Sequence, residues 1–393
     1  MEAVGAQRDS GGRIAAIDAL RGLVIVLMAL DHCRDFFDAD ALRFSPTDID
    51  RTYPFLFFTR FITHYCALTF ELLAGASAYL HGRRLANRRE LAIFLATRGL
   101  WLIFLDAVVV SPVWAPGSGK IWLGALWAIG AGMVALSALC WLPARVVLAL
   151  GASIVAGHNL FDGVTAENLG AWAPLWRLLH ERGPLPFGLG GAVGYPVLPW
   201  IGVICIGYGM GPLFEAPPER RRRLLVAAGL AALTGFVFLR IVDVYGDPRP
   251  WATQADVAKT LMSFLNVSKY PPSLLYLFVT LGPTLLALAA LEKADSRRLW
   301  FSVLLGFGRA ALFAYVLHLW IAVLAALALA LASGFTAADI GAFAASRAPP
   351  DGFGVGLAGA YVAWALVLLV LYPLCRGFGA AKSRRHSRLL SYF

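Results

Sequence analysis

The sequence of 393 residues predicts an all-α protein, a polytopic bundle of transmembrane helices. The first observation is composition: 59% of the residues are hydrophobic and only 15% are charged, whereas a soluble domain carries about 25% charged residues. The second is the recurrence, along the whole chain, of apolar runs of about 20 residues, each long enough to cross about 30 Å of hydrocarbon. We therefore expect the protein to lie in a lipid bilayer.

The apolar runs define ten expected spans. In order they cover residues 14–32, 55–80, 91–111, 121–141, 144–158, 195–214, 224–244, 270–291, 303–333 and 353–375. The fifth is short and the ninth is long, so a count of eleven stays open. No linker, low-complexity tract or evident repeat divides the chain, and residues 1–393 are expected to form a single domain. The polar segment 1–13 is followed by no small-residue cleavage site, so no cleavable signal peptide is expected.

The charges of the loops predict the orientation of the spans. When alternate loops are assigned to two sides, the side with both termini has nearly twice as many Lys and Arg residues as the other. Its densest clusters lie in 81–90, 215–223 and the basic tail 376–393. The positive-inside rule places this side, and both termini, in the cytoplasm. The net charge of +10 thus reflects topology, and no nucleic-acid partner is expected.

Segments outside the membrane differ strongly in length between the two sides. The three longest, 33–54, 159–194 and 245–269, all fall on the side opposite the termini, whereas the cytoplasmic loops are short. Long loops held by a rigid scaffold commonly carry function. We expect the work of the protein to be done at its outer face.

The first span contains charged residues at both ends of the stretch RGLVIVLMALDH (21–32). Arg21 and His32 are eleven residues apart, close to three helical turns, so both project from one face about 16 Å apart along the axis. Asp18 lies one turn before Arg21, which makes a local ion pair plausible, and Asp31 adjoins His32. Charge inside a membrane is costly and usually functional.

The second span repeats the pattern. Arg60, His64 and Glu71 are spaced by four and seven residues, so on a continuous helix they lie within about 40° of one another. His64 is then about 14 Å deep in the membrane. A purely structural stripe of salt bridges is the alternative.

Other spans add polar groups that are unusual in lipid, and together these predict a polar interior that water or substrate can enter. They are Arg98 and Asp106 in the third span, Arg240 and Asp243 at the outer end of the seventh, Lys269 and Tyr270 at the start of the eighth, and Tyr315 and His318 in the ninth.

The common soluble catalytic motifs are absent from the sequence. It has no GxGxxG, P-loop, HExxH or GxSxG pattern. Its five cysteines form no CxxC, and no Cys/His set has zinc spacing, so no metal is expected. The cysteines are expected to be structural thiols in or near the membrane.

Five segments together resemble the bacterial relatives of heparan-alpha-glucosaminide N-acetyltransferase. They are RIAAIDALRGLVIVLMALDHCRDFF, THYCALTFELLAGASAYL, GYPVLPWIGVICIGYGMG, KYPPSLLYLFVTLGP and GRAALFAYVLHLW. The Arg21–His32 spacing also resembles a signature of the broader membrane acyltransferases that O-acetylate surface polysaccharides. The resemblance implies transfer of an acetyl or other acyl group from cytosolic acyl-CoA to a hydroxyl or amine of an extracytoplasmic sugar or glycan, in a bacterial plasma (inner) membrane.

The chain departs from the lysosomal enzyme at one point that the resemblance makes important. That enzyme uses a His in the loop between its first two spans, and residues 37–54 here contain no His. His32 and His64 are the candidates instead. We expect them to share one site between the outer halves of the first two spans, with His64 slightly favoured as the base and His32, next to Asp31, orienting the acceptor or sharing the proton. A histidine acting as general base and one acting as acyl carrier both stay open.

The remaining candidates are assigned by the needs of acyl transfer, which are charge for the CoA phosphates, donors for an oxyanion, and groups that hold the acceptor. The expected acyl-CoA contacts are Arg21, Arg60, Lys269 and Tyr270. The expected acceptor contacts are Glu71, Arg240, Asp243 and His318.

Two other functions compete with acyl transfer. A transporter or flippase also needs intramembrane charge, but we find no inverted repeats with matching broken helices. A non-catalytic scaffold would not need two deep histidines. The expected partners are the bilayer, acyl-CoA and a glycan or small sugar acceptor, and a homodimer stays open.

Overall fold

The computed structural model describes residues 14–384 except 115–117 and 347–348. The expected tail 1–13 and the last nine residues of the basic tail lie outside the described residues. The described chain is mostly helical and has three short strands, which confirms a predominantly α fold.

The helices follow one another along the whole chain. The α-helices are α1 (Ala15–Phe37), α2 (Ala39–Arg43), α3 (Pro54–Ile62), α4 (Tyr65–Gly82), α5 (Arg88–Leu105), α6 (Ser111–Trp114), α7 (Ala125–Leu139), α8 (Ala144–Gly157), α9 (Ala173–Leu179), α10 (Leu198–Gly209), α11 (Pro218–Val242), α12 (Val257–Leu265), α13 (Leu274–Leu291), α14 (Leu299–Gly308), α15 (Ala311–Ala332), α16 (Ala337–Ser346) and α17 (Leu357–Arg384). The π-helical turn η1 (Asp106–Val110) and the 3₁₀ turns η2 (His158–Phe161), η3 (Ala166–Trp172) and η4 (Gly211–Glu215) extend or join them.

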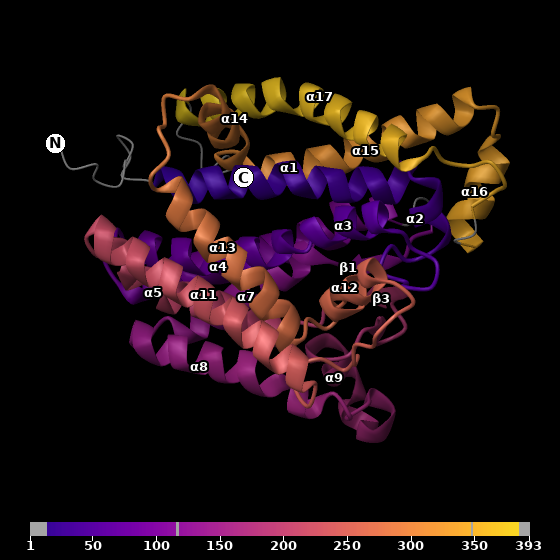
Figure 1. The fold of residues 1–393 in the computed structure, drawn as a ribbon. Helices are drawn as coiled ribbons and strands as arrows, with labels where there is room; N and C mark the ends of the chain where they lie inside the picture. Colours follow the sequence, from indigo (N-terminus) through magenta and orange to yellow (C-terminus); the bar gives the residue numbers. More distant parts are fainter. Residues whose placement is uncertain (1–13, 115–117, 347–348, 385–393) are drawn as a thin grey trace.

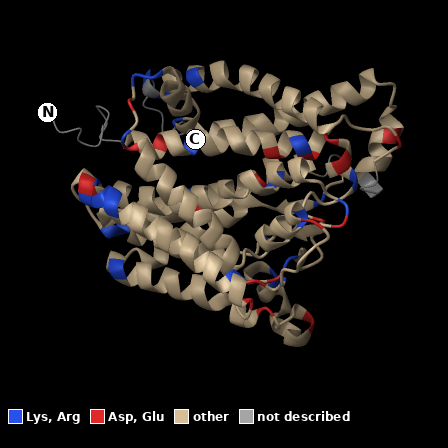
Figure 2. Cartoon of the chain, in the orientation of Figure 1, with Lys and Arg blue, Asp and Glu red and all other residues tan. Residues whose placement is uncertain are grey.

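Among the described residues, seven helical runs are long and apolar enough to cross a membrane. They are 88–114, 144–161, 198–215, 218–242, 274–291, 311–332 and 357–382. Acidic and basic residues lie mainly toward the two ends of the bundle, and the middle is largely uncharged (Figure 2). The chain is therefore a multi-pass membrane protein, whereas the count of ten spans and the cytoplasmic position of the termini stay predictions.

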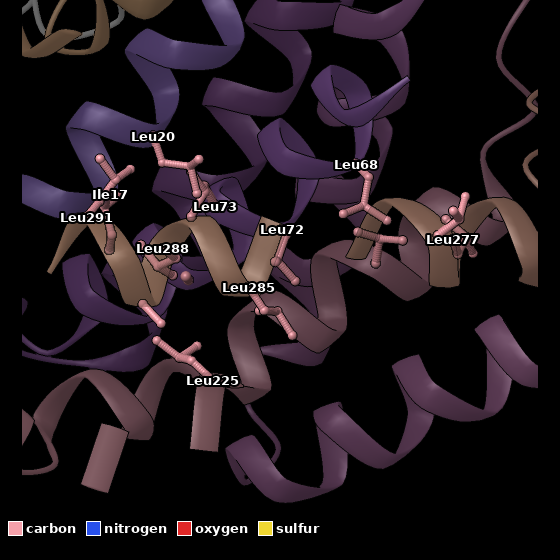
Figure 3. Packing of buried hydrophobic residues seen from close by; sticks show 14 of the residues in the cluster. Ile17, Leu20, Leu68, Leu72, Leu73, Leu225, Leu277, Leu285, Leu288 and Leu291 are labelled. Carbon is pink, nitrogen blue, oxygen red and sulfur yellow. The ribbon is translucent and has the colours of Figure 1, made fainter. Parts of the chain in front are cut away.

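Helix α1 runs through the interior of the bundle. Helices α14, α15 and α17 pack on one side of it, and α4 and α13 pack on the other (Figure 1). Leucine and isoleucine side chains of α1, α4, α11 and α13 interlock in one core cluster (Figure 3). The polar residues of α1 are therefore turned toward other helices, as their cost in lipid requires.

Glycines allow two pairs of helices to approach closely. A Cβ on Gly22 of α1 would lie 1.9 Å from the Leu304 carbonyl oxygen of α14, and one on Gly75 of α4 would lie 2.0 Å from the Ile204 carbonyl oxygen of α10. Small residues serve this purpose at helix contacts in membranes. Gly75 therefore lets α4 pack closely against α10.

The second expected span is not one continuous helix, which corrects the helical-wheel placement of its three polar residues. Helix α3 ends at Ile62 and α4 begins at Tyr65. The Tyr276 hydroxyl accommodates the break by donating to the His64 carbonyl at 2.6 Å, and Thr63 Oγ1 lies 2.8 Å from the Arg60 carbonyl oxygen. Backbone groups freed inside a membrane protein need such partners.

Three further boundaries differ from expectation. The ninth expected span is divided between α14 and α15, the fourth begins with a strand before α7, and the eighth begins at Leu274 rather than at residue 270. The strands are β1 (Ile121–Leu123), β2 (Gly183–Pro184) and β3 (Gly191–Val193). β3 pairs parallel with β1, Trp122 opposite Ala192, and antiparallel with β2. This small sheet fastens segment 159–194 to the residues that precede α7.

Candidate active site

A large cavity follows α1 through the bundle. Its volume is about 550 Å³, and its walls include side chains of α1 from Ile17 to Asp35. At about 1.5 Å per residue these two positions are about 27 Å apart, close to the thickness of a bilayer's hydrocarbon core. One elongated ligand can therefore reach toward both ends of the bundle.

Cationic side chains gather where the cavity meets the start of α1. Five of them line this end: Arg21, Arg84, Arg98, Arg309 and Lys382. Among the described residues this end has one lining carboxylate, Asp18, whose Oδ1 pairs with Arg21 Nη1 at 3.0 Å. That ion pair confirms the sequence expectation. An excess of cations over carboxylates makes this end, which we call the basic mouth, suited to an anion such as a phosphate group.

Asp31 joins the outer halves of α1 and α3. Arg60 Nη1 lies 2.8 and 2.6 Å from its two carboxylate oxygens, and Thr63 Oγ1 donates to Oδ1 at 2.6 Å. Arg34 Nη1 adds an ion pair at 2.7 Å. The last part of α1 therefore contacts the end of α3, whereas the side of the membrane on which they meet stays a prediction. The Asp31 carboxylate thus binds Arg60, Thr63 and Arg34. The described hydrogen bond of the His32 ring is made to another residue and not to Asp31.

His32 is paired with His318. His32 Nδ1 lies 2.7 Å from His318 Nε2, and His318 Nδ1 lies 2.9 Å from the Ala314 carbonyl oxygen. A carbonyl only accepts, so Nδ1 of His318 carries the proton, and Nε2 of a neutral ring is then an acceptor. His32 Nδ1 must donate to it. This assignment leaves Nε2 of His32 as a basic nitrogen.

Among His32, His64 and His318, His32 has the access that a catalytic base requires. It lines the cavity, and its ring meets Trp114 edge-on with the centroids 5.3 Å apart. His64 is 3% exposed and lies outside the set of lining residues, and its Nδ1 has no hydrogen-bond partner among the described residues. His318 is fully buried behind His32. The geometry favours His32 over His64, the reverse of the order that the sequence suggested.

Lys269 and Tyr270 lie in the loop before α13 and line the outer part of the cavity. The Tyr270 hydroxyl is 3.4 Å from both Arg60 Nη2 and the Tyr195 hydroxyl. Burial acts to raise the pKa of the Tyr270 phenol, but the cations of Lys269 and Arg60 outweigh it and lower that pKa to about 8. These donors face the end of the cavity that holds His32, so Arg60, Lys269 and Tyr270 lie far from the basic mouth.

Glu71 lies at the middle depth of the cavity. It is 2% exposed and lines the wall, and neither of its carboxylate oxygens has a hydrogen-bond partner among the described residues. A buried polar group without a partner is costly. Its position suits a contact with a ligand that passes along the cavity.

Two candidates from the seventh span lie away from the cavity. Arg240 is fully buried and donates to the backbone carbonyls of Phe264, Ser263, Arg249 and Asn266 at 2.7–3.1 Å. Asp243 lies 3.7 Å from it and ends α11. Arg240 therefore holds segment 245–269 in place, and neither Arg240 nor Asp243 is a lining residue.

Sequence reasoning missed several lining residues. Arg84 belongs to the basic stretch 81–90, which was explained by topology alone, and Arg309 is the second residue of the segment GRAALFAYVLHLW. Trp114, Arg182 and Tyr195 complete the outer part of the cavity. Tyr195 stands in the segment GYPVLPW, so its signal was present. Trp114 and Arg182 come from connecting segments, and the sequence does not show where these segments lie in the fold.

The arrangement can support transfer of a group from a long anionic donor. One end of the cavity is lined mainly by cations and suits an anion, the other holds a basic nitrogen, and hydroxyl and cationic donors surround that nitrogen. A base together with donors for developing negative charge is what attack on a carbonyl requires.

A comparison with protein families agrees with this chemistry. The family model for the catalytic region of heparan-alpha-glucosaminide N-acetyltransferase matches residues 13–240, more than half of the chain. The match includes His32, Arg60 and the first part of the basic mouth, and it ends before Lys269 and His318. No curated protein matches the chain.

Proposed function

Because the chain belongs to the catalytic family of heparan-alpha-glucosaminide N-acetyltransferase, a family of membrane acetyltransferases, we propose that it moves an acetyl group across a bacterial plasma membrane. The donor is cytosolic acetyl-CoA, and the acceptor is a hydroxyl or amine of a sugar or glycan on the outer side. The observation that carries the proposal is the cavity along α1, which has a basic mouth at one end and the His32–His318 pair at the other.

The cavity matches the donor in shape and charge. The phosphates of CoA are bound by the basic mouth, with Arg21 as one contact. The narrow pantetheine arm extends along α1, past the unpartnered carboxylate of Glu71, whose oxygens can accept from an amide N–H. The thioester then lies beside His32. In this placement Arg60, Lys269 and Tyr270 contact the reacting carbonyl of acetyl-CoA and not its nucleotide.

The chemical step uses the basic Nε2 of His32. As the acceptor oxygen or nitrogen bonds to the thioester carbon, Nε2 takes its proton, and the carbon–sulfur bond breaks as the intermediate collapses. The departing thiolate receives the proton from His32. Tyr270 and the neighbouring cations donate to the oxyanion. General-base catalysis contributes about 10²–10⁴-fold, and His318 keeps His32 in the required tautomer.

The basic mouth also supports an orientation. Cationic loops favour the cytoplasm, and the mouth lies at the end where α1 begins and α17 ends (Figure 1). We therefore propose that both termini lie in the cytoplasm. A cysteine replacing Asn168, in a chain without native thiols, should react with an impermeant reagent from outside. Labelling only after lysis would reverse the orientation.

A transporter or flippase would also use a cavity that follows a whole helix. The asymmetry of the cavity favours group transfer, because among the described residues one end has five lining cations and one lining carboxylate, whereas the other end holds a fixed basic nitrogen. A passage for one substrate does not need two chemically different ends.

The proposal is tested with purified protein, radiolabelled acetyl-CoA, and glucosamine or envelope glycans as acceptors. We expect label on the acceptor. His32→Ala should lose about 10²–10⁴-fold in turnover while it still binds CoA, and His64→Ala should stay within about tenfold of wild type, as expected for a residue outside the proton transfer. Loss of turnover in His64→Ala alone would return the role of base to His64. Label that stays on His32 would show an acyl carrier instead of a base.

A further inference from the structure

A second group of polar side chains lies outside the cavity, at the outer end of α8. His158 opens η2, Asp162 follows that turn, and His180 ends α9. Both histidines are buried, whereas Asp162 is exposed. Within the part of the chain that the structure describes, these three form the one His/Cys/Asp/Glu cluster with metal-binding spacing.

The spacing of the three side chains is that of ligands around one small cation. His158 Nδ1 and His180 Nε2 are 3.4 Å apart, His180 Nε2 and Asp162 Oδ1 are 3.8 Å apart, and all three atoms lie within 4.8 Å of one another. Zinc bonds of about 2.0–2.2 Å in tetrahedral geometry separate ligand atoms by about 3.3–3.6 Å. Small side-chain rotations would bring all three atoms onto one ion.

Neighbouring residues already orient two of these ligands. Asn159 Nδ2 donates to Asp162 Oδ2 at 2.8 Å, so the other carboxylate oxygen faces His180. The His180 ring is stacked on Trp176, with centroids 5.0 Å apart. Supporting contacts of this kind are typical of metal sites. His180 Nε2 also lies 2.9 Å from the His158 carbonyl oxygen, so metal binding must displace a proton from that nitrogen.

We propose that His158, Asp162 and His180 bind one divalent transition-metal ion of the zinc class. Two imidazoles and one carboxylate suit zinc, and water completes the tetrahedron on the exposed side of Asp162. The ion links the end of α8 to the end of α9. It thereby fixes the segment that continues into Arg182, a lining residue of the cavity's outer part. The site is independent of the acetyl-transfer proposal.

The test uses the full-length chain, purified in detergent without an affinity tag and treated with a chelator. Zn²⁺ binding is measured by equilibrium dialysis and elemental analysis, and Co²⁺ is added as a spectroscopic probe. Thermal unfolding is followed with and without Zn²⁺. Asp162→Asn removes one ligand at an exposed position, and Glu167→Gln removes an exposed carboxylate of the same segment as a matched control.

Wild type and Glu167→Gln should each bind one Zn²⁺, give the visible bands of tetrahedral Co²⁺, and unfold at a higher temperature when Zn²⁺ is present. Asp162→Asn should stay folded and bind Zn²⁺ about 10- to 100-fold more weakly than wild type. This is at least the loss of affinity expected when a residue that only supports a metal ligand is replaced. Stoichiometry far below one, or equal affinity in Asp162→Asn and wild type, would overturn the proposal.

Discussion

The pairing of His318 with His32 makes a prediction about a residue that does not line the cavity. His318→Leu removes the acceptor for the His32 Nδ1 proton and keeps an apolar side chain of similar bulk in α15. The proton on His32 can then move to Nε2, the nitrogen that must accept the proton of the acceptor. His318→Gln can still offer an oxygen near the lost Nε2 position.

The size of the effect follows from the hydrogen bond that is lost. His32 Nδ1 lies 2.7 Å from His318 Nε2 in a buried setting, and leaving a buried donor without its partner costs about 1–3 kcal/mol. That range corresponds to about 5- to 150-fold in rate. It is smaller than the about 10²–10⁴-fold expected when the base itself is removed, because Nε2 remains available in part of the molecules.

The assay is steady-state acetyl transfer with varied acetyl-CoA, together with the melting temperature of each variant. We expect kcat of His318→Leu to fall by about 5- to 150-fold with little change in KM. His318→Gln should recover most of the lost kcat. His32→Ala combined with His318→Leu should be no slower than His32→Ala alone, since both changes act through one ring.

Two results would refute this reasoning. If His318→Leu had wild-type kcat, the hydrogen bond would not control the tautomer of His32. If His318→Gln and His318→Leu lost activity equally while both melted well below wild type, His318 would serve packing and not proton transfer.

Three further outcomes are expected. Arg21→Ala should raise KM for acetyl-CoA about tenfold or more at similar kcat, and exposed Arg223→Ala should not; equal KM values would remove Arg21 from the phosphate site. Activity should fall as pH rises through the lowered pKa of Tyr270, about 8, because its hydroxyl then loses the proton it donates; a Tyr270→Phe profile with the same alkaline limb would exclude this. Gly75→Ala places a Cβ 2.0 Å from an α10 carbonyl and should cost at least about 1–3 kcal/mol, whereas Gly157→Ala, with open space around it, should leave the melting temperature nearly unchanged.

The sequence was sufficient for the class of fold and the family. Hydropathy and charge predicted a helical membrane protein, since the bilayer constrains every span in the same way. The Asp18–Arg21 pair was also predictable, because its geometry is set within one helical turn. Helix geometry relates residues only a few positions apart, so contacts within one helix could be predicted from the sequence.

The features that depend on distant partners could not be derived. His32 and His318 are separated by 286 residues, and no periodicity connects them. The break at Thr63 is accommodated by the hydroxyl of the distant Tyr276, which donates to the His64 carbonyl. The break moved His64 out of the stripe that a continuous helix would have formed, and with it the preferred base.

The cations of the basic mouth and the ligands of the proposed metal site could not be derived from the sequence for the same reason. Arg309 and Lys382 come from two helices that meet only in the folded bundle. His158 and Asp162 are four residues apart, but the third ligand, His180, is brought back by the fold of segment 159–194. Their separation in sequence does not match a zinc motif.

The most direct test of transmembrane acetyl transfer uses sealed proteoliposomes with the basic mouth of the protein facing outward. Acetyl-CoA labelled in the acetyl group is added outside, and glucosamine or a glycan acceptor is enclosed inside. Our account predicts that labelled acceptor accumulates inside with wild-type protein and fails to do so with His32→Ala. Label on the acceptor only when both substrates are on the same side, or equal transfer by His32→Ala, would contradict it.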